Sequence, residues 1–475
     1  MDSEKFEYFE SLFHPKSMAI IGASENSIFY LFAPGSTGFK GKIYAVNPSR
    51  DSILNFKCYK SILDIDDDID LATVTVPAKY TPDVMRECVE KEVKTAHFFT
   101  SGFSETGTEE GKKLEQELLK ISRNGSTRIL GPNCMGIYCP ESGLSFLPGF
   151  PKKPGPVAFI AQSGALTEQV IYSGRMRGVG FSKVVSYGNA IDLDNPDFME
   201  YLAEDPKTKI ISTYIEGTKN GRKFYETIKE AVKKKPVIVW KGGQTERGAV
   251  AVSSHTGSLA GSGNIWKAVL TQIGAINIRD LEDLMDTYLV FLHNPFPRGR
   301  RGLIVSFSGG ESVTETDKAV EMGLEIPLLS KETKEKIEEM VPVAGISTRN
   351  PLDIPYAFFQ FSNIAKVVKV AASEDNIDFV IFELLDRYRS LGKRFRGFQW
   401  YVDLRKSIRE AANYIKNELG KPFVIAVLPA FSEQEAINLR KFYTARGISV
   451  VPSMTRASKA IKRMIEYREF LDKQK

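Results

Sequence analysis

Cysteine, histidine and long apolar runs are all scarce in this chain of 475 residues. It has four cysteines and four histidines, and the spacing of Cys134 and Cys139 matches no common zinc motif. So few cysteines favour a reducing compartment, and we expect a cytoplasmic protein. No run of about 18 apolar residues occurs, so no membrane-spanning helix is expected. The acidic start has no apolar core and does not predict a signal peptide.

An excess of charge of one sign is also missing. The net charge of +5 is the difference between 64 Lys and Arg and 59 Asp and Glu. A nucleic-acid-binding protein would concentrate its basic residues in one stripe. The sequence has no such stripe, so we expect no nucleic acid partner. A hydrophobic content of 42% and a charged content of 26% are typical of a globular protein, and the length predicts two to four domains.

Short apolar runs alternate with longer amphipathic stretches along the whole chain. Strands separated by helices predict parallel sheets covered on both faces, so the fold class is α/β. Strands are predicted at 18–21, 43–46, 71–76, 95–99, 157–160, 210–215, 237–239, 303–307, 379–382 and 423–427. Helices are predicted at 111–123, 225–234, 432–445 and 456–475.

Two proline-rich segments predict the domain boundaries. The segment 148–156 holds four prolines, and the segment 293–302 combines prolines, glycines and arginines. Neither composition suits a helix or a central strand. The two linkers predict three α/β units of about 150 residues each, an ordinary domain size, at residues 1–150, 151–295 and 296–475.

The first unit begins like a nucleotide-binding domain. A predicted strand leads into Gly22, Ala23 and Ser24, a tight turn in which backbone N–H groups can approach a phosphate. The dinucleotide fingerprint G-x-G-x-x-G is absent, which argues against an NAD-dependent oxidoreductase. Four more turns follow predicted strands. In one parallel sheet these turns would all lie at the same edge, although any one of them could be an ordinary turn without a ligand. They contain Asn47 and Pro48, Val76 to Ala78, Thr100 and Ser101, and Asn133 and Cys134.

The second unit holds a candidate anion site and a candidate nucleophile. Gln162, Ser163 and Gly164 follow a strand and precede a helical stretch, so they would lie at a helix N-terminus that favours an anion. A plain serine N-cap is the alternative. Further on, His255 lies in a predicted loop of small and hydroxyl-bearing residues, 253–261, and a helical pattern follows from Asn264.

The surroundings of His255 favour a functional histidine over a structural one. It lacks the apolar neighbours of a core position and the second His or Cys of a metal site, so no metal is predicted there. A neutral imidazole beside a helix N-terminus is suited to carry a phosphoryl group. Glu216, at the end of the strand 210–215, could accept the other ring N–H and fix the tautomer.

Several segments match one known family in the same order. The most specific are GPNC at 131–134 and SHTGSLAG at 254–261; others are IIGAS at 20–24, GFKGKIYAVNP at 38–48, AQSGAL at 161–166, YIEG at 214–217, SGG at 308–310 and RNPLDI at 349–354. On these motifs the chain resembles, over most of its length, the α subunits of ADP-forming acyl-CoA synthetases, relatives of succinyl-CoA synthetase.

The resemblance implies a fold, a reaction and a set of site residues. A Rossmann-like CoA-binding domain would precede two flavodoxin-like domains. Acyl-CoA, ADP and phosphate would be converted reversibly to carboxylic acid, ATP and CoA, through an acyl phosphate and a phosphohistidine at His255 that Glu216 hydrogen-bonds. Two helix N-termini would cradle the phosphate, at Gln162, Ser163, Gly164 and at Thr256, Gly257, Ser258. The CoA site is matched by Gly22, Ala23, Ser24, Asn47, Pro48, Val76, Pro77, Ala78, Thr100, Ser101, Asn133 and Cys134.

Two departures from the family pattern bear on the ligands. The family's first turn usually continues with a Pro-Gly-x-x-Gly element, whereas the segment 25–37 is shorter and lacks it. No segment corresponds to an ATP-grasp module, so the resemblance implies a separate ATP-grasp β subunit in an α₂β₂ assembly. That partner would hold most of the ADP or ATP and Mg²⁺. The acyl group and the choice of ADP or GDP stay open, and a non-catalytic CoA-binding regulatory paralogue is the alternative that His255 and Glu216 disfavour.

Overall fold

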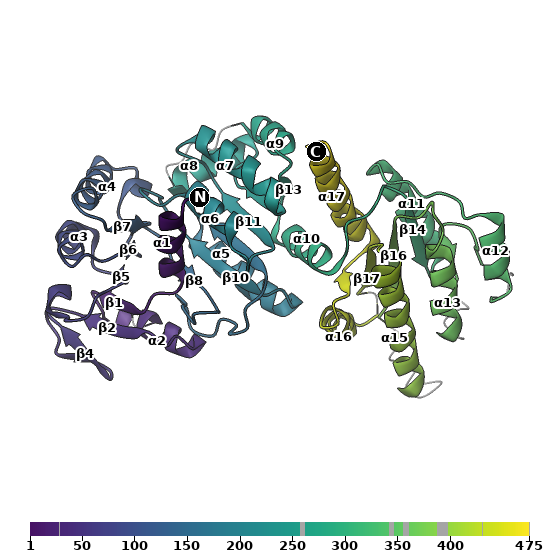
Figure 1. Ribbon diagram of the computed structural model, residues 1–475, viewed down its shortest axis with the longest axis horizontal. Coiled ribbons are helices and arrows are strands. Elements are labelled where there is room, and N and C mark those ends of the chain that lie inside the picture. Colours follow the sequence, from purple (N-terminus) through teal and green to yellow (C-terminus); the bar gives the residue numbers. More distant parts are fainter. Residues whose placement is uncertain are drawn as a thin grey trace. The chain divides into compact units, whose positions relative to one another are not determined.

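The computed structural model describes residues 1–27, 29–256, 262–341, 346–354, 361–386, 398–429 and 431–474. They form two compact units, residues 1–280 and 281–475, and contain three mostly parallel sheets (Figure 1). The predicted α/β class is confirmed, and each of the ten predicted strands overlaps an observed one. The domain boundaries near residues 150 and 295 stay predictions.

The first sheet of unit 1 gathers strand ends along one edge. Its order is β3-β4-β2-β1-β5-β6-β7, and every pair except β3–β4 is parallel. The strands are β1 Ser17–Ile21, β2 Lys42–Val46, β3 Ser52–Ile53, β4 Phe56–Tyr59, β5 Leu71–Val74, β6 Thr95–Phe98 and β7 Arg128–Leu130. The helices are α1 Ser3–Phe13, α2 Phe29–Thr37, α3 Thr81–Glu90 and α4 Glu109–Ser122, with α3 packed beside α4 (Figure 1).

The second sheet of unit 1 has the order β13-β12-β11-β9-β10-β8. Only β8 runs antiparallel to its neighbour. The strands are β8 Gly136–Tyr138, β9 Val157–Ala161, β10 Phe181–Ser186, β11 Ile210–Ile215, β12 Val237–Lys241 and β13 Ile276–Ile278. The helices are α5 Gly164–Arg177, α6 Asn195–Glu204, α7 Gly221–Lys234, α8 Glu246–Thr256 and α9 Gly263–Gln272. All five residues of β9 are buried, as expected for a central parallel strand.

Unit 2 is built on a parallel sheet with the order β15-β14-β16-β17-β18. The strands are β14 Gly302–Ser306, β15 Leu352–Asp353, β16 Phe379–Leu385, β17 Phe423–Leu428 and β18 Ser449–Val451. The helices are α10 Leu281–His293, α11 Gly309–Glu321, α12 Lys331–Glu338, α13 Phe361–Ala372, α15 Phe398–Asn413, α16 Glu433–Thr444 and α17 Met454–Asp472. Apolar side chains of the sheet and its helices form two buried clusters within this unit.

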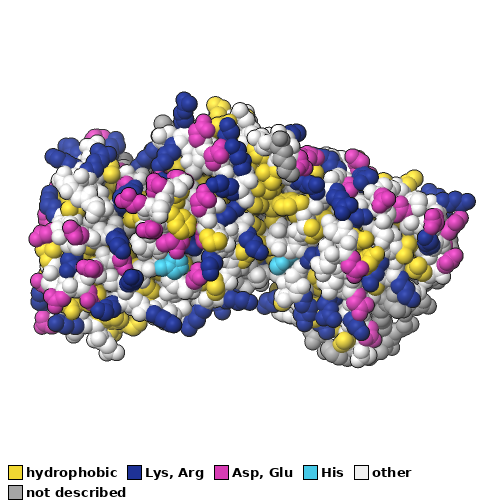
Figure 2. Space-filling model, in the orientation of Figure 1, with side chains coloured by type: hydrophobic (Ala, Val, Ile, Leu, Met, Phe, Trp, Pro, Cys, Tyr) yellow, Lys and Arg dark blue, Asp and Glu magenta, His cyan; other side chains and the backbone are white. Residues whose placement is uncertain are grey.

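On the face drawn in Figure 2, Lys and Arg side chains lie among Asp and Glu side chains over most of the surface. None of the helices among the described residues is both long and apolar enough to cross a bilayer.

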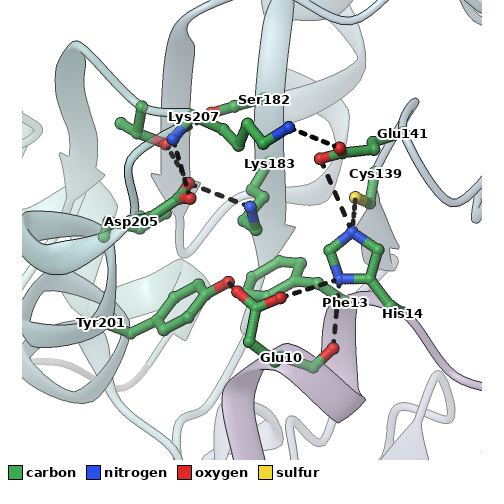
Figure 3. A network of polar contacts seen from close by, with 12 residues as sticks. Glu10, Phe13, His14, Cys139, Glu141, Ser182, Lys183, Tyr201, Asp205 and Lys207 are labelled. Carbon is green, nitrogen blue, oxygen red and sulfur yellow. Dashed lines mark hydrogen bonds and ion pairs between the residues drawn. The ribbon is translucent and has the colours of Figure 1, made fainter. Parts of the chain in front are cut away.

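The N-terminal helix α1 is fastened to the second sheet of unit 1 by rings and buried charges (Figure 3). The ring of Tyr201 on α6 stacks on Phe13, with centroids 5.4 Å apart, and its hydroxyl donates to Glu10. Beside these rings, the ammonium of Lys183 pairs with Asp205 at 3.0 Å, and both side chains are 1% exposed. A helix from before the first sheet thus packs on the second, and the two sheets belong to one compact unit.

Candidate functional site

A pocket of about 250 Å³ lies where the two sheets of unit 1 meet. One wall is the turn that carries GPNC, after β7, and the opposite wall is the start of α5. The lining residues are Phe99, Asn133, Cys134, Met135, Gln162, Ser163, Gly164, Ala165, Gly188 and Asn189. Five predicted site residues are therefore brought together here: Asn133, Cys134, Gln162, Ser163 and Gly164.

The first turn of α5 points at this pocket. Ser163 is the N-cap residue, and its hydroxyl oxygen accepts a hydrogen bond from the backbone N–H of Leu166 at 3.3 Å. The first N–H groups of a helix have no acceptor within the helix, and the dipole adds positive potential there. A side chain at position 164 would meet Cγ of Met135 at 2.5 Å, so glycine is needed for the close approach of the two walls. The geometry suits an anion such as phosphate.

The side chain of Gln162 has a partner that the sequence did not predict. Its oxygen Oε1 accepts hydrogen bonds from the backbone N–H of Glu216 at 2.5 Å and of Gly217 at 3.1 Å. Because β9 and β11 are neighbours, their carboxyl ends place these residues side by side. Gln162 therefore fixes the backbone at the predicted catalytic carboxylate.

Glu216 is 4% exposed and is surrounded by polar groups from two strands. The hydroxyl of Tyr214 donates to Oε1 at 3.2 Å, whereas the buried Oε2 has no hydrogen-bond partner among the described residues. Lys241, at the end of β12, donates to the backbone oxygen of Glu216 at 2.7 Å. Burial lowers the pKa of Lys241 to about 8, and the negative charge of Glu216 opposes that shift. Burial also raises the pKa of Tyr214, so its hydroxyl is a donor at neutral pH.

The predicted turn at Gly22 is present, but its N–H groups are already used. Gly22 has φ +83°, and the N–H groups of Gly22 and Ala23 both donate to the backbone oxygen of Val46, at 3.0 and 3.2 Å. The N–H of Ser24 donates to the hydroxyl of Ser27 at 3.0 Å. A phosphate bound at this turn would have to replace these hydrogen bonds or be held by other groups.

The remaining predicted CoA residues lie at the carboxyl edge of the first sheet. Asn47 donates to the backbone oxygen of Ala23 at 2.8 Å, and Thr100 donates to that of Val76 at 2.6 Å, so the turns support one another. Pro48, Pro77 and Ser101 are exposed, and Ala78 and Asn133 are half-buried. Cys134 is only 4% exposed, and burial raises the pKa of its thiol. It therefore shapes the pocket wall as a neutral, apolar group.

The phosphohistidine segment differs from its prediction. The sequence predicts a loop from Ser253, but α8 continues at least to Thr256, so the backbone of His255 is helical. The helix starts at Glu246, where the hydroxyl of Thr245 accepts from the N–H of Gly248 at 3.1 Å, and the alanines that follow favour its extension. Thr256 is thus the last described residue of α8, and its predicted role at a helix N-terminus stays a prediction. Gly257, Ser258 and the side chain of His255 lie outside the described residues.

Sequence reasoning missed four residues that complete the site. Gly188 and Asn189 follow β10 and line the pocket, and the rule that ligands bind at carboxyl ends of parallel strands would have found them. Tyr214 on β11 begins the matched motif YIEG and Lys241 ends β12, but nothing in the sequence shows that either side chain contacts Glu216. Among the described residues, no group of three or more His, Cys, Asp and Glu side chains could hold a metal ion.

Comparisons with known proteins agree with this geometry. Residues 16–140 match the family model described as a CoA binding domain, and residues 154–291 match the succinyl-CoA ligase like flavodoxin domain. The α subunit of the ADP-forming acetate–CoA ligase I of Pyrococcus furiosus is 36% identical over 477 residues, which cover 98% of this chain and 99% of that subunit.

A solved structure and a longer relative extend the comparison. The dinucleotide-forming acetyl-coenzyme A synthetase 1 of Ca. Korarchaeum cryptofilum, in complex with phosphate and ADP, has a TM-score of 0.83 and 30% identity over 98% of both chains. The ADP-forming acetate–CoA ligase I of Archaeoglobus fulgidus is 39% identical over 376 residues, or 78% of this chain, which spans only 54% of that relative. The chain therefore belongs to the ADP-forming acyl-CoA synthetases of the succinyl-CoA synthetase superfamily, as a counterpart of their α subunits.

Proposed function

We propose that this chain is the α subunit of an ADP-forming acyl-CoA synthetase that uses His255 as its phosphoryl carrier. The observation that carries the proposal is the pocket between the GPNC turn and the N-terminus of α5. It combines an anion-binding helix end with Asn133 from the CoA-binding part of unit 1. At about 250 Å³ it suits a phosphate and a small acyl group, whereas the bulk of CoA would lie outside it.

The proposed reaction has three steps, each reversible. A phosphate oxygen attacks the thioester carbonyl carbon of acyl-CoA, the C–S bond breaks, and CoA leaves as a thiolate that takes up a proton. A ring nitrogen of His255 then attacks the phosphorus of the acyl phosphate, the bond from phosphorus to the acyl oxygen breaks, and the carboxylate leaves. Finally an oxygen of ADP attacks the phosphorus of the phosphohistidine, which returns the free imidazole and forms ATP.

The chain's own residues supply binding and positioning for these steps. The start of α5, with Ser163 and Gly164, stabilises the charge on the transferring phosphoryl group. Glu216 accepts the second ring N–H of His255 and so presents the correct nitrogen as the nucleophile. CoA is held at the edge of the first sheet, by the turns that begin at Gly22, Asn47, Val76 and Thr100.

The nucleotide step needs a second protein in this proposal. Relatives of matching length are named α subunits, and an ATP-grasp β subunit would bind ADP or ATP, with Mg²⁺ bound to the nucleotide. An α₂β₂ assembly is the arrangement we propose. Acetate is the first acid to test, because several relatives that match this chain are named for it.

Phosphoryl labelling of the full-length chain tests the proposal. The chain is incubated with radiolabelled phosphate and acetyl-CoA, and in a second series with an ATP-grasp β subunit and ATP labelled at the γ-phosphate. We expect acid-labile, base-stable label that is absent from His255→Ala and retained in His293→Gln, a control in unit 2. No label in either series, in a protein that still binds CoA, would contradict the catalytic function and favour a regulatory CoA-binding protein.

A further inference from the structure

Lys241 is a buried cation next to the predicted catalytic glutamate. It ends β12, its side chain is 3% exposed, and its ammonium group donates to the backbone oxygens of Glu216 and Gly242. The indole ring of Trp266 on α9 lies with its centroid 5.2 Å from Nζ. Burying an ammonium group is expensive unless hydrogen bonds and charge compensate it. The compensation here comes from the segment that carries Glu216.

The backbone of Glu216 is held from both sides of its strand. Gln162, directly after β9, accepts its N–H, and Lys241, the last residue of β12, donates to its C=O. The three residues end three neighbouring parallel strands, so the sheet itself sets their spacing. A backbone held in this way fixes the point from which the Glu216 side chain extends.

The carboxylate of Glu216 is only partly satisfied. Tyr214 donates to Oε1, but Oε2 is buried and unpartnered among the described residues. An unpaired buried acceptor destabilises a protein by about 1–3 kcal/mol, more when it is charged. Such an oxygen is ready to accept a donor that arrives during the reaction, and the ring N–H of His255 is the donor that the proposed function requires.

We propose that Lys241 is a positioning residue for the phosphohistidine step: it fixes Glu216 and compensates its charge, so that Oε2 can receive the imidazole of His255. The inference rests on the proposed function and adds a residue to it. Lys241 acts through Glu216 and does not touch the transferred phosphoryl group.

The charge on Lys241 makes this role dependent on pH. Its pKa is lowered to about 8 by burial, and Glu216 is the charged group that opposes the shift. Among the described residues, the ring of Trp266 also lies beside the ammonium group, and the titratable hydroxyl of Tyr214 lies next to Gly242, whose backbone oxygen accepts from Lys241. Lys241 is therefore charged at neutral pH and loses its proton as the pH rises through about 8, so labelling of His255 should slow over that range.

Two variants separate positioning from simple packing. Lys241→Met keeps about the length of the side chain and removes the charge, and we expect slower labelling at neutral pH, by up to about 100-fold if Glu216 shifts by 1 Å. It should also lose the alkaline decline. Lys241→Arg keeps a charge that does not titrate in this range, so labelling should continue above pH 8. Circular dichroism and thermal unfolding establish that both variants fold.

Lys235 provides a matched control. It precedes β12 at its other end, donates to the backbone oxygens of Leu202 at 2.7 Å and Asp205 at 2.5 Å, and has a pKa lowered by burial. Lys235→Met removes a half-buried lysine with the same kind of contacts but far along the strand. We expect it to label at the wild-type rate with an unchanged pH profile.

The experiment measures labelling of full-length chains from acetyl-CoA and radiolabelled phosphate, from neutral to alkaline pH. Tryptophan fluorescence is titrated in parallel, because protonation of Lys241 beside Trp266 should give a transition that Lys241→Met lacks. Unchanged labelling and an unchanged profile in Lys241→Met would overturn the role of Lys241 and leave the proposed function standing. The absence of a Lys241-dependent fluorescence transition would also overturn it. Failure of the wild-type chain to label would instead overturn the proposed function, and this role with it.

Discussion

Gln162 fastens the backbone of Glu216: one side-chain oxygen accepts the N–H of Glu216 at 2.5 Å and of Gly217 at 3.1 Å. The motif that contains Gln162 predicts a phosphate-binding turn, and the backbone of that turn lines the pocket. The side chain serves the neighbouring strand instead. Gln162 thus connects the proposed phosphate site to the predicted catalytic carboxylate. A substitution in one of them should therefore alter the geometry of the other.

Replacing Gln162 by methionine should weaken both stability and labelling. Methionine has a similar length but cannot accept hydrogen bonds, so two backbone N–H groups lose their partner. Each unsatisfied buried donor costs about 1–3 kcal/mol, and the free energy of unfolding in urea measures the loss. Gln399→Met is the control, because Gln399 is exposed and donates only to Asp403 in the same helix. If Gln162→Met is labelled at the wild-type rate, the hydrogen bonds from Glu216 and Gly217 to Gln162 are not needed for the reaction.

Glu216→Gln tests the carboxylate itself. The amide keeps the size of the side chain and can still accept from Tyr214, but it binds a ring N–H more weakly and carries no charge. General acid–base groups contribute about 10²–10⁴-fold, so labelling of His255 should fall by about 100-fold or more while CoA binding stays unchanged. Calorimetry measures the binding. Glu230→Gln on the exposed face of α7 should leave both quantities as they are.

Most of the long buried parallel strands were predicted, but β10, FSKVVS with Lys183 at its centre, was not. The run 210–215 coincides with β11, in which every residue except Tyr214 is buried because both faces of a parallel sheet are covered. The edge strand β8, Gly136–Tyr138, is short and antiparallel, so it carries no such run and was not predicted. The small residues around His255 predict a loop, but α8 begins at Glu246 and includes the residues up to Thr256.

The site could be predicted only in part, because some of its contacts depend on packing between segments that are distant in the sequence. The carboxyl ends of β9 and β11 predicted that Gln162 and Glu216 belong to one edge, and the structure places them in contact. Lys241 follows the same rule, but a lysine at a strand end is normally solvated. Its burial depends on the packing of α9, with Trp266, over the strand end, and no local pattern shows that.

His97 should make unit 1 sensitive to acid. It is 3% exposed, its Nε2 lies 3.0 Å from the backbone oxygen of Cys134, and burial lowers its pKa from 6.5 to about 4. The unfolded chain therefore binds a proton between pH 6.5 and 4 that the folded chain does not. The contribution to stability is complete above pH 6.5 and falls as the pH drops to 4, by about 3 kcal/mol in all.

Urea unfolding and the NMR titration of the ring measure this effect. The free energy of unfolding of the wild type should fall more steeply with acid than that of His97→Gln, and the difference between the two curves isolates the histidine. The ring resonance should titrate near pH 4. A ring that titrates near 6.5, with parallel curves for both proteins, would contradict the prediction.

The buried pair Lys183–Asp205 should be sensitive to the loss of either partner. Both side chains are 1% exposed and lie 3.0 Å apart beneath α1. Lys183→Met or Asp205→Asn leaves a buried group without its partner and should destabilise by about 3–5 kcal/mol, whereas the double variant should lose less than the sum. Lys233→Met, at an exposed pair with Glu230, should change stability by at most about 1 kcal/mol. Additive losses in urea unfolding would show that the two charges do not interact.

Gly22→Ala tests whether the first turn belongs to the CoA site. The residue has φ +83°, and a Cβ there would lie 2.7 Å from Cγ1 of Val76. The left-handed conformation alone destabilises an L-residue by about 1–2 kcal/mol, and relief of the clash should move the turn that contains Val76. We therefore expect weaker CoA binding in calorimetry together with lower stability. Gly35→Ala is the control: it lies in α2 with open space around it, and alanine there should stabilise by up to about 1 kcal/mol. If Gly22→Ala unfolds more easily yet binds CoA as tightly as the wild type, the turn supports the sheet and CoA is held elsewhere.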